Sequence, residues 1–124
     1  MIKTNKGFYV GDISYVLADD VYFDFWGKQK GYADGEFEVN GFRFAVASTA
    51  YGDGVFYDTA RLIYPVDAGV IGVVPFELVA KPEGLELGAW YDIPGEAWLK
   101  SKNGIISISL NGIITEIDTK NGDV

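Results

Sequence analysis

The sequence predicts a mainly β fold: an antiparallel, partly open barrel or sandwich with one short helix at about residues 18–27 and a C-terminal three-stranded meander. Three observations lead to this prediction. Three Asn-Gly pairs stand between apolar segments, and such pairs are a strong signal for two-residue hairpin turns. Residues 70–74 form a continuous apolar run of mostly β-branched type, as expected for a strand buried on both faces. The 16 glycines suit turns and bulges.

The first apolar segment, residues 8–17, is interrupted by Gly11-Asp12. A glycine followed by an aspartate inside an apolar segment is typical of a turn or a bulge. We therefore expect one strand that is broken at this point.

Residues 18–27 predict the helix. Asp19 or Asp20 suits its N-cap, and Gly27 suits the position just past its C-terminus. A weakly alternating strand within the same residues is the alternative. Residues 28–35 are expected to form a loop.

The Asn40-Gly41 pair predicts a hairpin that joins residues 36–39 to residues 42–46. A two-residue turn fixes the register of such a hairpin. The expected cross-strand pairs are Val39 with Phe42, Phe37 with Phe44, and Glu38 with Arg43.

Residues 51–75 form the central stretch of the chain. Gly52-Asp53-Gly54 and Asp67-Ala68-Gly69 predict turns. Strands at residues 55–57 and 61–64 are expected between these turns, and the buried strand at residues 70–74 follows them. Beyond it, the strand continues or a short helical turn begins after Pro75, and further strands are expected toward the C-terminus.

The C-terminal third predicts the meander. Two Asn-Gly pairs, at positions 103–104 and 111–112, lie between three six-residue segments of strand type. Pairing across both turns gives an apolar face and a polar row, and this agreement favours the register. The apolar face holds Ala97, Leu99, Ile106, Ile108, Leu110, Ile113 and Ile117, and the polar row holds Lys100, Ser107 and Glu116.

Composition excludes several chemistries. The chain of 124 residues has the length of one domain, and it contains no cysteine and no histidine. Thiolate zinc sites, cysteine nucleophiles and Ser-His-Asp triads are therefore excluded. The net charge of −8 argues against nucleic-acid binding. No apolar run has the length of a membrane helix and no signal peptide is evident, so we expect no membrane interaction and a cytoplasmic location.

Two groups of residues are candidates for function. Asp12, Asp53 and Asp67 stand in glycine-containing turns, where carboxylates and backbone amides can contact a ligand or a metal ion. Tyrosines beside acidic residues suit an interaction surface, because tyrosine is enriched at interface hot spots. The expected members of that surface are Tyr51, Tyr57, Asp58 and Tyr64.

Three segments resemble a loose set of small uncharacterised bacterial and phage proteins. The segments are G-D-x-x-Y-V at residues 11–16, G-D-G-x-[FY] at residues 52–56, and V-D-x-G-x-I-G-x-[VI]-P at residues 66–75. The resemblance covers roughly the first 75 residues and brings no activity with it. If these proteins share a site, the resemblance implies Asp12, Asp53 and Asp67 as its members.

These observations favour a non-enzymatic protein-interaction module, similar to an inhibitor or an immunity protein, with a basic surface as one option for its partner. One alternative is a β domain that binds a small molecule or a divalent metal through Asp53 and Asp67. Another is a carboxylate-dependent hydrolase. No cofactor is expected, with calcium as the open alternative, and the oligomeric state stays open.

Overall fold

A computed structural model of the chain describes residues 1–29 and 34–120. Within these residues the fold is mainly β: three antiparallel sheets, none of them closed into a barrel, and one α-helix. The predicted fold class is confirmed, and the architecture is a sandwich.

Eleven strands in the described residues make up the sheets. The five-stranded sheet has the order β3 (Gly35–Val39), β4 (Phe42–Ser48), β7 (Val70–Pro75), β2 (Phe8–Gly11) and β8 (Ala89–Tyr91). The four-stranded sheet has the order β1 (Ile2–Thr4), β9 (Gly95–Lys102), β10 (Ile105–Leu110) and β11 (Ile113–Asp118). The third sheet is the hairpin of β5 (Gly54–Tyr57) and β6 (Ile63–Val66).

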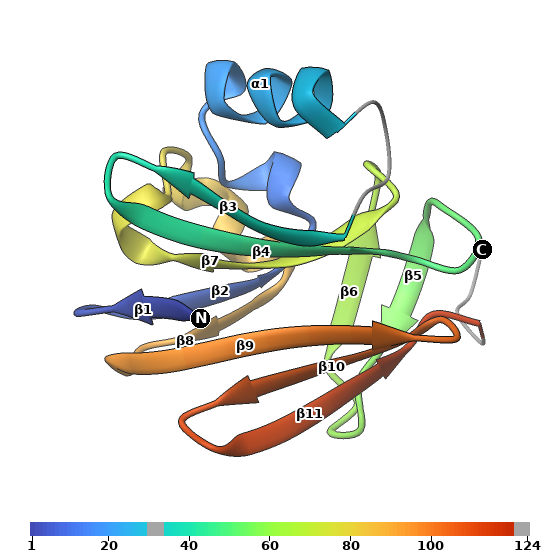
Figure 1. Ribbon diagram of the computed structural model, residues 1–124. Coiled ribbons are helices and arrows are strands. Elements are labelled where there is room, and N and C mark those ends of the chain that lie inside the picture. The colour runs from blue at the N-terminus through green and yellow to red at the C-terminus, as the bar shows by residue number, and fades with distance from the viewer. Residues whose placement is uncertain (30–33, 121–124) are drawn as a thin grey trace.

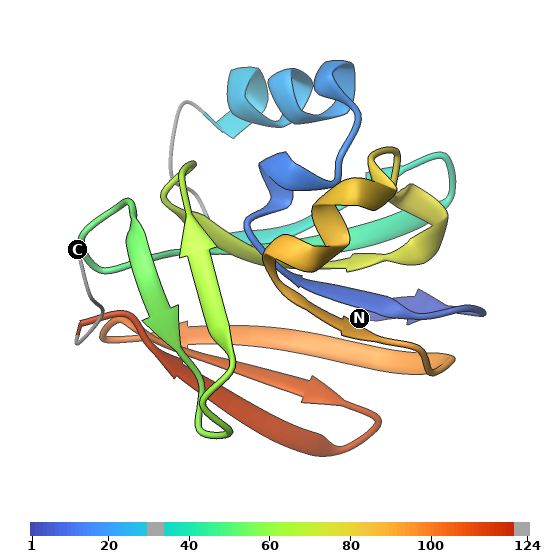
Figure 2. The same ribbon diagram turned by 180° about the vertical axis from the view of Figure 1, so that it is seen from behind.

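The two larger sheets face each other, and the β5–β6 hairpin stands across one end of the sandwich (Figure 1). Helix α1 (Asp19–Gln29) lies over the outer side of the five-stranded sheet (Figure 1). Seen from behind, the hairpin lies in front of the four-stranded sheet and no other described element crosses it (Figure 2).

Strand β7 lies at the centre of the five-stranded sheet and is buried at all six positions. Its alternating side chains serve two hydrophobic cores. Ile71 and Val73 belong to the core between the sheets. Val70 and Val74 belong to the core beneath α1. The prediction of a strand buried on both faces is therefore confirmed.

All three Asn-Gly turns are confirmed. The asparagines have φ values of 51–53° and the glycines that follow them have φ values of 79–87°. Positive φ at both central residues is the type I′ geometry that favours these two residue types. The register around Asn40-Gly41 is as predicted, with Glu38 opposite Arg43.

The meander has the predicted register as well. Ile106 pairs with Ile117, and Ser107 lies between Lys100 and Glu116. Ile113 is 74% exposed although it shares the apolar face, because it lies beside the β10–β11 turn on an edge strand.

The predicted end of the helix and the predicted loop after it are wrong in part. Helix α1 continues past Gly27 to Gln29, so this glycine lies inside the helix, has no positive φ, and does not end it. Residues 28 and 29 of the expected loop belong to the helix, and residues 30–33 lie outside the described residues.

The chain after Gly11 forms a 3₁₀ helix, η1 (Ile13–Tyr15), where the continuation of a strand was expected. The side chain of Asp12 caps η1 and stabilises the change of direction. After Pro75 the helical alternative is confirmed by the 3₁₀ helix η2 (Phe76–Leu78), and a third, η3 (Pro82–Leu87), follows.

Candidate functional site

The β5–β6 hairpin decides where most of the predicted site residues lie. Gly54 pairs with Val66, so Asp53 and Asp67 flank the same open end of the hairpin. Asp58 lies at the opposite end, in the hairpin tip. Asp58 is therefore separated from Asp53 and Asp67, because the antiparallel pairing places the tip and the open end at opposite ends of the hairpin.

Asp12 reaches the open end of the hairpin, but as a structural group. Its side chain is fully buried and accepts four hydrogen bonds. Oδ1 accepts from the backbone N and the Oγ of Ser14 at 2.8 and 2.7 Å. Oδ2 accepts from the backbone N of Asp67 and Ala68 at 2.6 and 2.8 Å. Asp12 therefore ties η1 to the β6–β7 turn, and its oxygens are occupied by these donors.

The exposed carboxylate of Asp67 accepts a hydrogen bond from the hydroxyl of Tyr15 at 2.6 Å. Burial raises the pKa of this hydroxyl above its ordinary value, and the hydrogen bond to Asp67 raises it further. The negative charges of Asp12, Asp67 and Asp53 act in the same direction on the pKa of Tyr15. The hydroxyl is thus held as a donor at the rim of the hairpin.

Two members of the expected interaction surface are buried. Asp58 is 7% exposed and Tyr64 is fully buried. The Tyr64 hydroxyl donates to Asp58 Oδ2 at 2.7 Å, while Asp58 Oδ1 accepts from the backbone N of Ala60 and Leu62. Asp58 and Tyr64 therefore organise the hairpin tip from inside, and their prediction as surface residues is wrong.

The hairpin tip also contacts the edge of the four-stranded sheet. Asp58 forms an isolated bridge with Ile117 of β11, and the backbone N of Thr59 donates to the carbonyl of Glu116 at 3.1 Å. These contacts fix the hairpin against β11.

The hairpin is apolar on both of its faces. Phe56, Tyr64 and Val66 are buried on the inner face, within the core between the sheets. The alternate residues Val55, Tyr57, Ile63 and Pro65, here called the outer hairpin face, point the other way because strand side chains alternate. Ile63 is 56% exposed and Tyr57 is 38% exposed, with Leu62 beside them at 46%.

Sequence reasoning placed Tyr57 on a surface but missed the rest of the outer hairpin face. The missed signal is that residues 55–57 and 63–66 are apolar at every position, which means two apolar faces on each strand. A two-stranded sheet at the periphery can bury only one of them. Tyr51, in the β4–β5 loop that leads to the open end, is 76% exposed.

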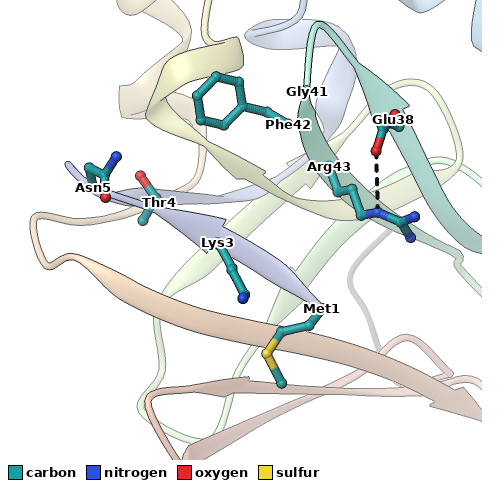
Figure 3. A pocket seen from close by; sticks show the side chains of 8 residues that line it. All are labelled: Met1, Lys3, Thr4, Asn5, Glu38, Gly41, Phe42 and Arg43. Atoms are coloured by element: carbon teal, nitrogen blue, oxygen red, sulfur yellow. Dashed lines mark ion pairs between the residues drawn. The ribbon is translucent and has the colours of Figure 1, made fainter.

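A further hollow of the surface has no chemistry that suggests a ligand. The groove between β1 and the β3–β4 hairpin has a volume of about 410 Å³ and is lined by Lys3 and Arg43 among others (Figure 3). Arg43 turns toward Glu38 and pairs with it at 3.8 Å (Figure 3). Lys3 pairs with Glu96 at 3.8 Å. Both cations thus already have carboxylate partners.

In residues 1–29 and 34–120, no group of three or more acidic side chains is arranged to hold a metal ion. The same part of the chain contains no helix that is both long and apolar enough to cross a membrane. Comparisons with protein-family models, with curated proteins and with solved structures gave no match.

Proposed function

We propose that this protein is a non-enzymatic interaction module, similar in kind to an inhibitor or an immunity protein, which binds a partner protein through the outer hairpin face. The observation that carries the proposal is that Tyr57 and Ile63 are exposed side by side on a hairpin that is apolar on both faces. Apolar side chains that gather on an exposed surface mark interaction sites.

The chemistry of the partner follows from the ends of the hairpin. Asp53 and Asp67 are exposed at the open end. A partner that places an apolar group on the face and a basic group at this end gains both burial and charge complementarity. Tyr15, whose hydroxyl is held by Asp67, and the exposed Tyr51 enlarge the contact with side chains that lose little entropy on binding.

The two alternative functions have less support. Among the residues that the structure describes, a metal site at Asp53 and Asp67 has no third carboxylate, and the side chain of Asp12 is saturated by Ser14 and the β6–β7 turn. A carboxylate hydrolase needs a cleft between its two acids. The hollow beside this end is lined by residues 48–52 and by Gly69, and neither aspartate lines it.

The experiment is affinity capture from a lysate of the source organism with the purified protein and two matched variants. Ile63→Ser lies on the outer hairpin face, and Ile114→Ser lies on β11 with almost the same exposure, 57% against 56%. We expect one stoichiometric partner that is captured by the parent chain and by Ile114→Ser. Ile63→Ser should lower the affinity for this partner at least tenfold, which corresponds to about 1.4 kcal/mol of binding free energy.

A charge variant tests the second half of the proposal. Asp53→Asn with Asp67→Asn should weaken capture, while Glu96→Gln with Glu116→Gln, which removes the same charge elsewhere on the surface, should not. Equal capture by all variants, or no stoichiometric capture at low salt, would contradict the proposed function.

A further inference from the structure

The outer hairpin face, Val55, Tyr57, Ile63 and Pro65, is bordered by opposite charges at its two ends. Asp53 and Asp67 lie at the open end, and Arg61 lies in the tip. The strands between them have four residues, which at about 3.3 Å per residue separates the two ends by roughly 10–15 Å. The face therefore has an acidic end, an apolar middle and a basic end.

We infer that a second copy of this chain covers the outer hairpin face in solution, with the two hairpins packed face to face and antiparallel about a twofold axis. The inference rests on the proposed function, which is that this face binds protein. It adds which protein binds there, namely a second copy of the same chain. The chain itself carries the pattern that the face requires, because the basic Arg61 stands next to the exposed Leu62 and Ile63.

Antiparallel packing satisfies both ends of the face at once. The twofold axis lies between the two faces, opposite the middle of each hairpin and perpendicular to its strands. It therefore places the tip of each copy over the open end of the other. Arg61 of each copy then meets the carboxylates of Asp53 and Asp67 in its partner. Parallel packing would instead place like charges together, so charge selects the antiparallel arrangement.

Arg61 is available for such a contact. It is exposed, and it forms no ion pair with any residue of the described parts of the chain. Its backbone is held in the tip, with φ at 68° and its N–H donating to the Asp58 carbonyl at 3.0 Å. Little backbone freedom is therefore lost when the tip docks.

The middle of the face supplies the apolar contact. Tyr57 and Ile63 are the cross-strand pair next to the tip, and Val55 and Pro65 are the pair next to the open end, so the twofold axis brings each pair against the other pair in the second copy. Sheets that pack face to face lie about 10 Å apart, a spacing that side chains of this size fill. The net charge of −8 repels the two copies at long range, but this repulsion is screened at about 0.15 M salt over roughly 8 Å.

The test is sedimentation equilibrium of the purified chain at several concentrations and about 0.15 M salt. We expect a concentration-dependent dimer. Arg61→Glu should weaken it at least tenfold, because two ends of the interface become acid against acid. Lys102→Glu is the control, since it makes the same charge change at an exposed lysine of β9 and should leave the dimer intact.

A mixing experiment isolates the charge contact. The double variant Asp53→Lys with Asp67→Lys should also be weakened, but an equimolar mixture with Arg61→Glu should form a heterodimer, because both contacts then join opposite charges. Circular dichroism and thermal unfolding check that each variant is folded. If the double variant is unfolded, the single variant Asp53→Lys takes its place.

A chain that stays monomeric at all concentrations, a dimer that Arg61→Glu does not weaken, or a mixture that fails to associate would overturn the inference. These outcomes are separate from failure of the proposed function. A monomeric chain whose partner capture is lost in Ile63→Ser disproves the dimer and keeps the interaction module. A dimer whose lysate capture does not depend on the outer hairpin face disproves the module as proposed.

Discussion

Asp12 illustrates how a residue in a site-like motif can serve the fold. It stands in a Gly-Asp turn and shares a region with Asp53 and Asp67, yet its side chain is buried and meets only donors. A buried carboxylate is costly unless its oxygens are hydrogen-bonded. Four donors meet that requirement here, and they hold η1 and the β6–β7 turn together.

Asp12→Asn is expected to destabilise the protein by about 2–4 kcal/mol. The amide NH₂ would replace an acceptor that faces two donors, so one set of buried N–H groups would lose its partner whichever way the amide is turned. Urea unfolding measures the change. Asp53→Asn is the control and should change the free energy of unfolding by less than about 0.5 kcal/mol, because Asp53 is exposed. Equal effects of the two substitutions would contradict the structural role of Asp12.

The sequence could nominate the three aspartates but could not divide their roles. Asp12, Asp53 and Asp67 have the same local pattern of a carboxylate beside glycine or alanine. What separates them is the position of segments about 55 residues apart, since the backbone of Asp67 and Ala68 donates to Asp12. Contacts of that kind are absent from local sequence patterns.

Elements were predictable where the turn chemistry is unambiguous. The three Asn-Gly turns and their registers follow from local φ requirements, and the structure has them as predicted. The end of α1 could not be predicted, because Gly27 suits either a helix C-terminus or a helix interior. Nothing within 4 Å would meet a Cβ at this glycine, so no close packing fixes its identity.

Asn111 is expected to contribute more than the other asparagines of these turns. Its Oδ1 accepts from the backbone N of Glu96 at 2.9 Å, and its Nδ2 donates to the carbonyl of Pro94 at 3.1 Å. Asn103 has the same φ of 53° and no such side-chain bonds among those that the described residues form. Asn111→Ala should therefore destabilise the protein by about 1 kcal/mol more than Asn103→Ala, measured by urea unfolding. Equal losses of unfolding free energy in the two variants would show that the positive φ alone accounts for the contribution of Asn111 to stability.

At the scale of the whole molecule, the two large sheets are joined by polar contacts as well as by their core. Thr4 belongs to β1 of the four-stranded sheet, and Glu77 belongs to η2, which directly follows β7 of the five-stranded sheet. The Thr4 hydroxyl and the backbone N of Asn5 donate to the two oxygens of Glu77 at 2.5 and 2.8 Å. A single carboxylate thus links the two layers.

This link predicts a pH dependence of stability. Partial burial raises the pKa of Glu77, but the hydrogen bonds from Thr4 and Asn5 outweigh it and hold the pKa below its ordinary value of 4.5. A lowered pKa in the folded state means stability that is present above pH 4.5 and is lost as the pH falls through the folded pKa.

Glu77→Gln should therefore lower the free energy of unfolding by about 1 kcal/mol at pH 7 and make the acid limb of the stability curve shallower. Thermal unfolding between about pH 7 and 3 measures both effects, since the carboxylates titrate in this range. The exposed Glu86→Gln serves as the control and should leave the curve unchanged. An unchanged acid limb in Glu77→Gln would contradict the role of this link.

Large parts of the architecture lay outside what the sequence could predict. Long-range pairing determines the order of the strands in each sheet and the position of the β5–β6 hairpin across the end of the sandwich. Local periodicity gives no information about such pairing. The exposed outer hairpin face follows from that placement: Tyr57 and Ile63 would read equally well as core residues in a larger sheet.

The contact of the hairpin tip with β11 has one more consequence. An unpaired strand edge invites aggregation, because its free N–H and C=O groups can recruit strands from other molecules. β11 is such an edge, and its exposed Ile113 and Ile114 carry no charge to deter recruitment. Asp58 and Thr59 occupy the edge next to Ile117 and Glu116 and limit the length that a foreign strand could reach. The tip thus covers part of this edge, and a shortened tip is expected to lower the solubility of the protein even where the fold survives.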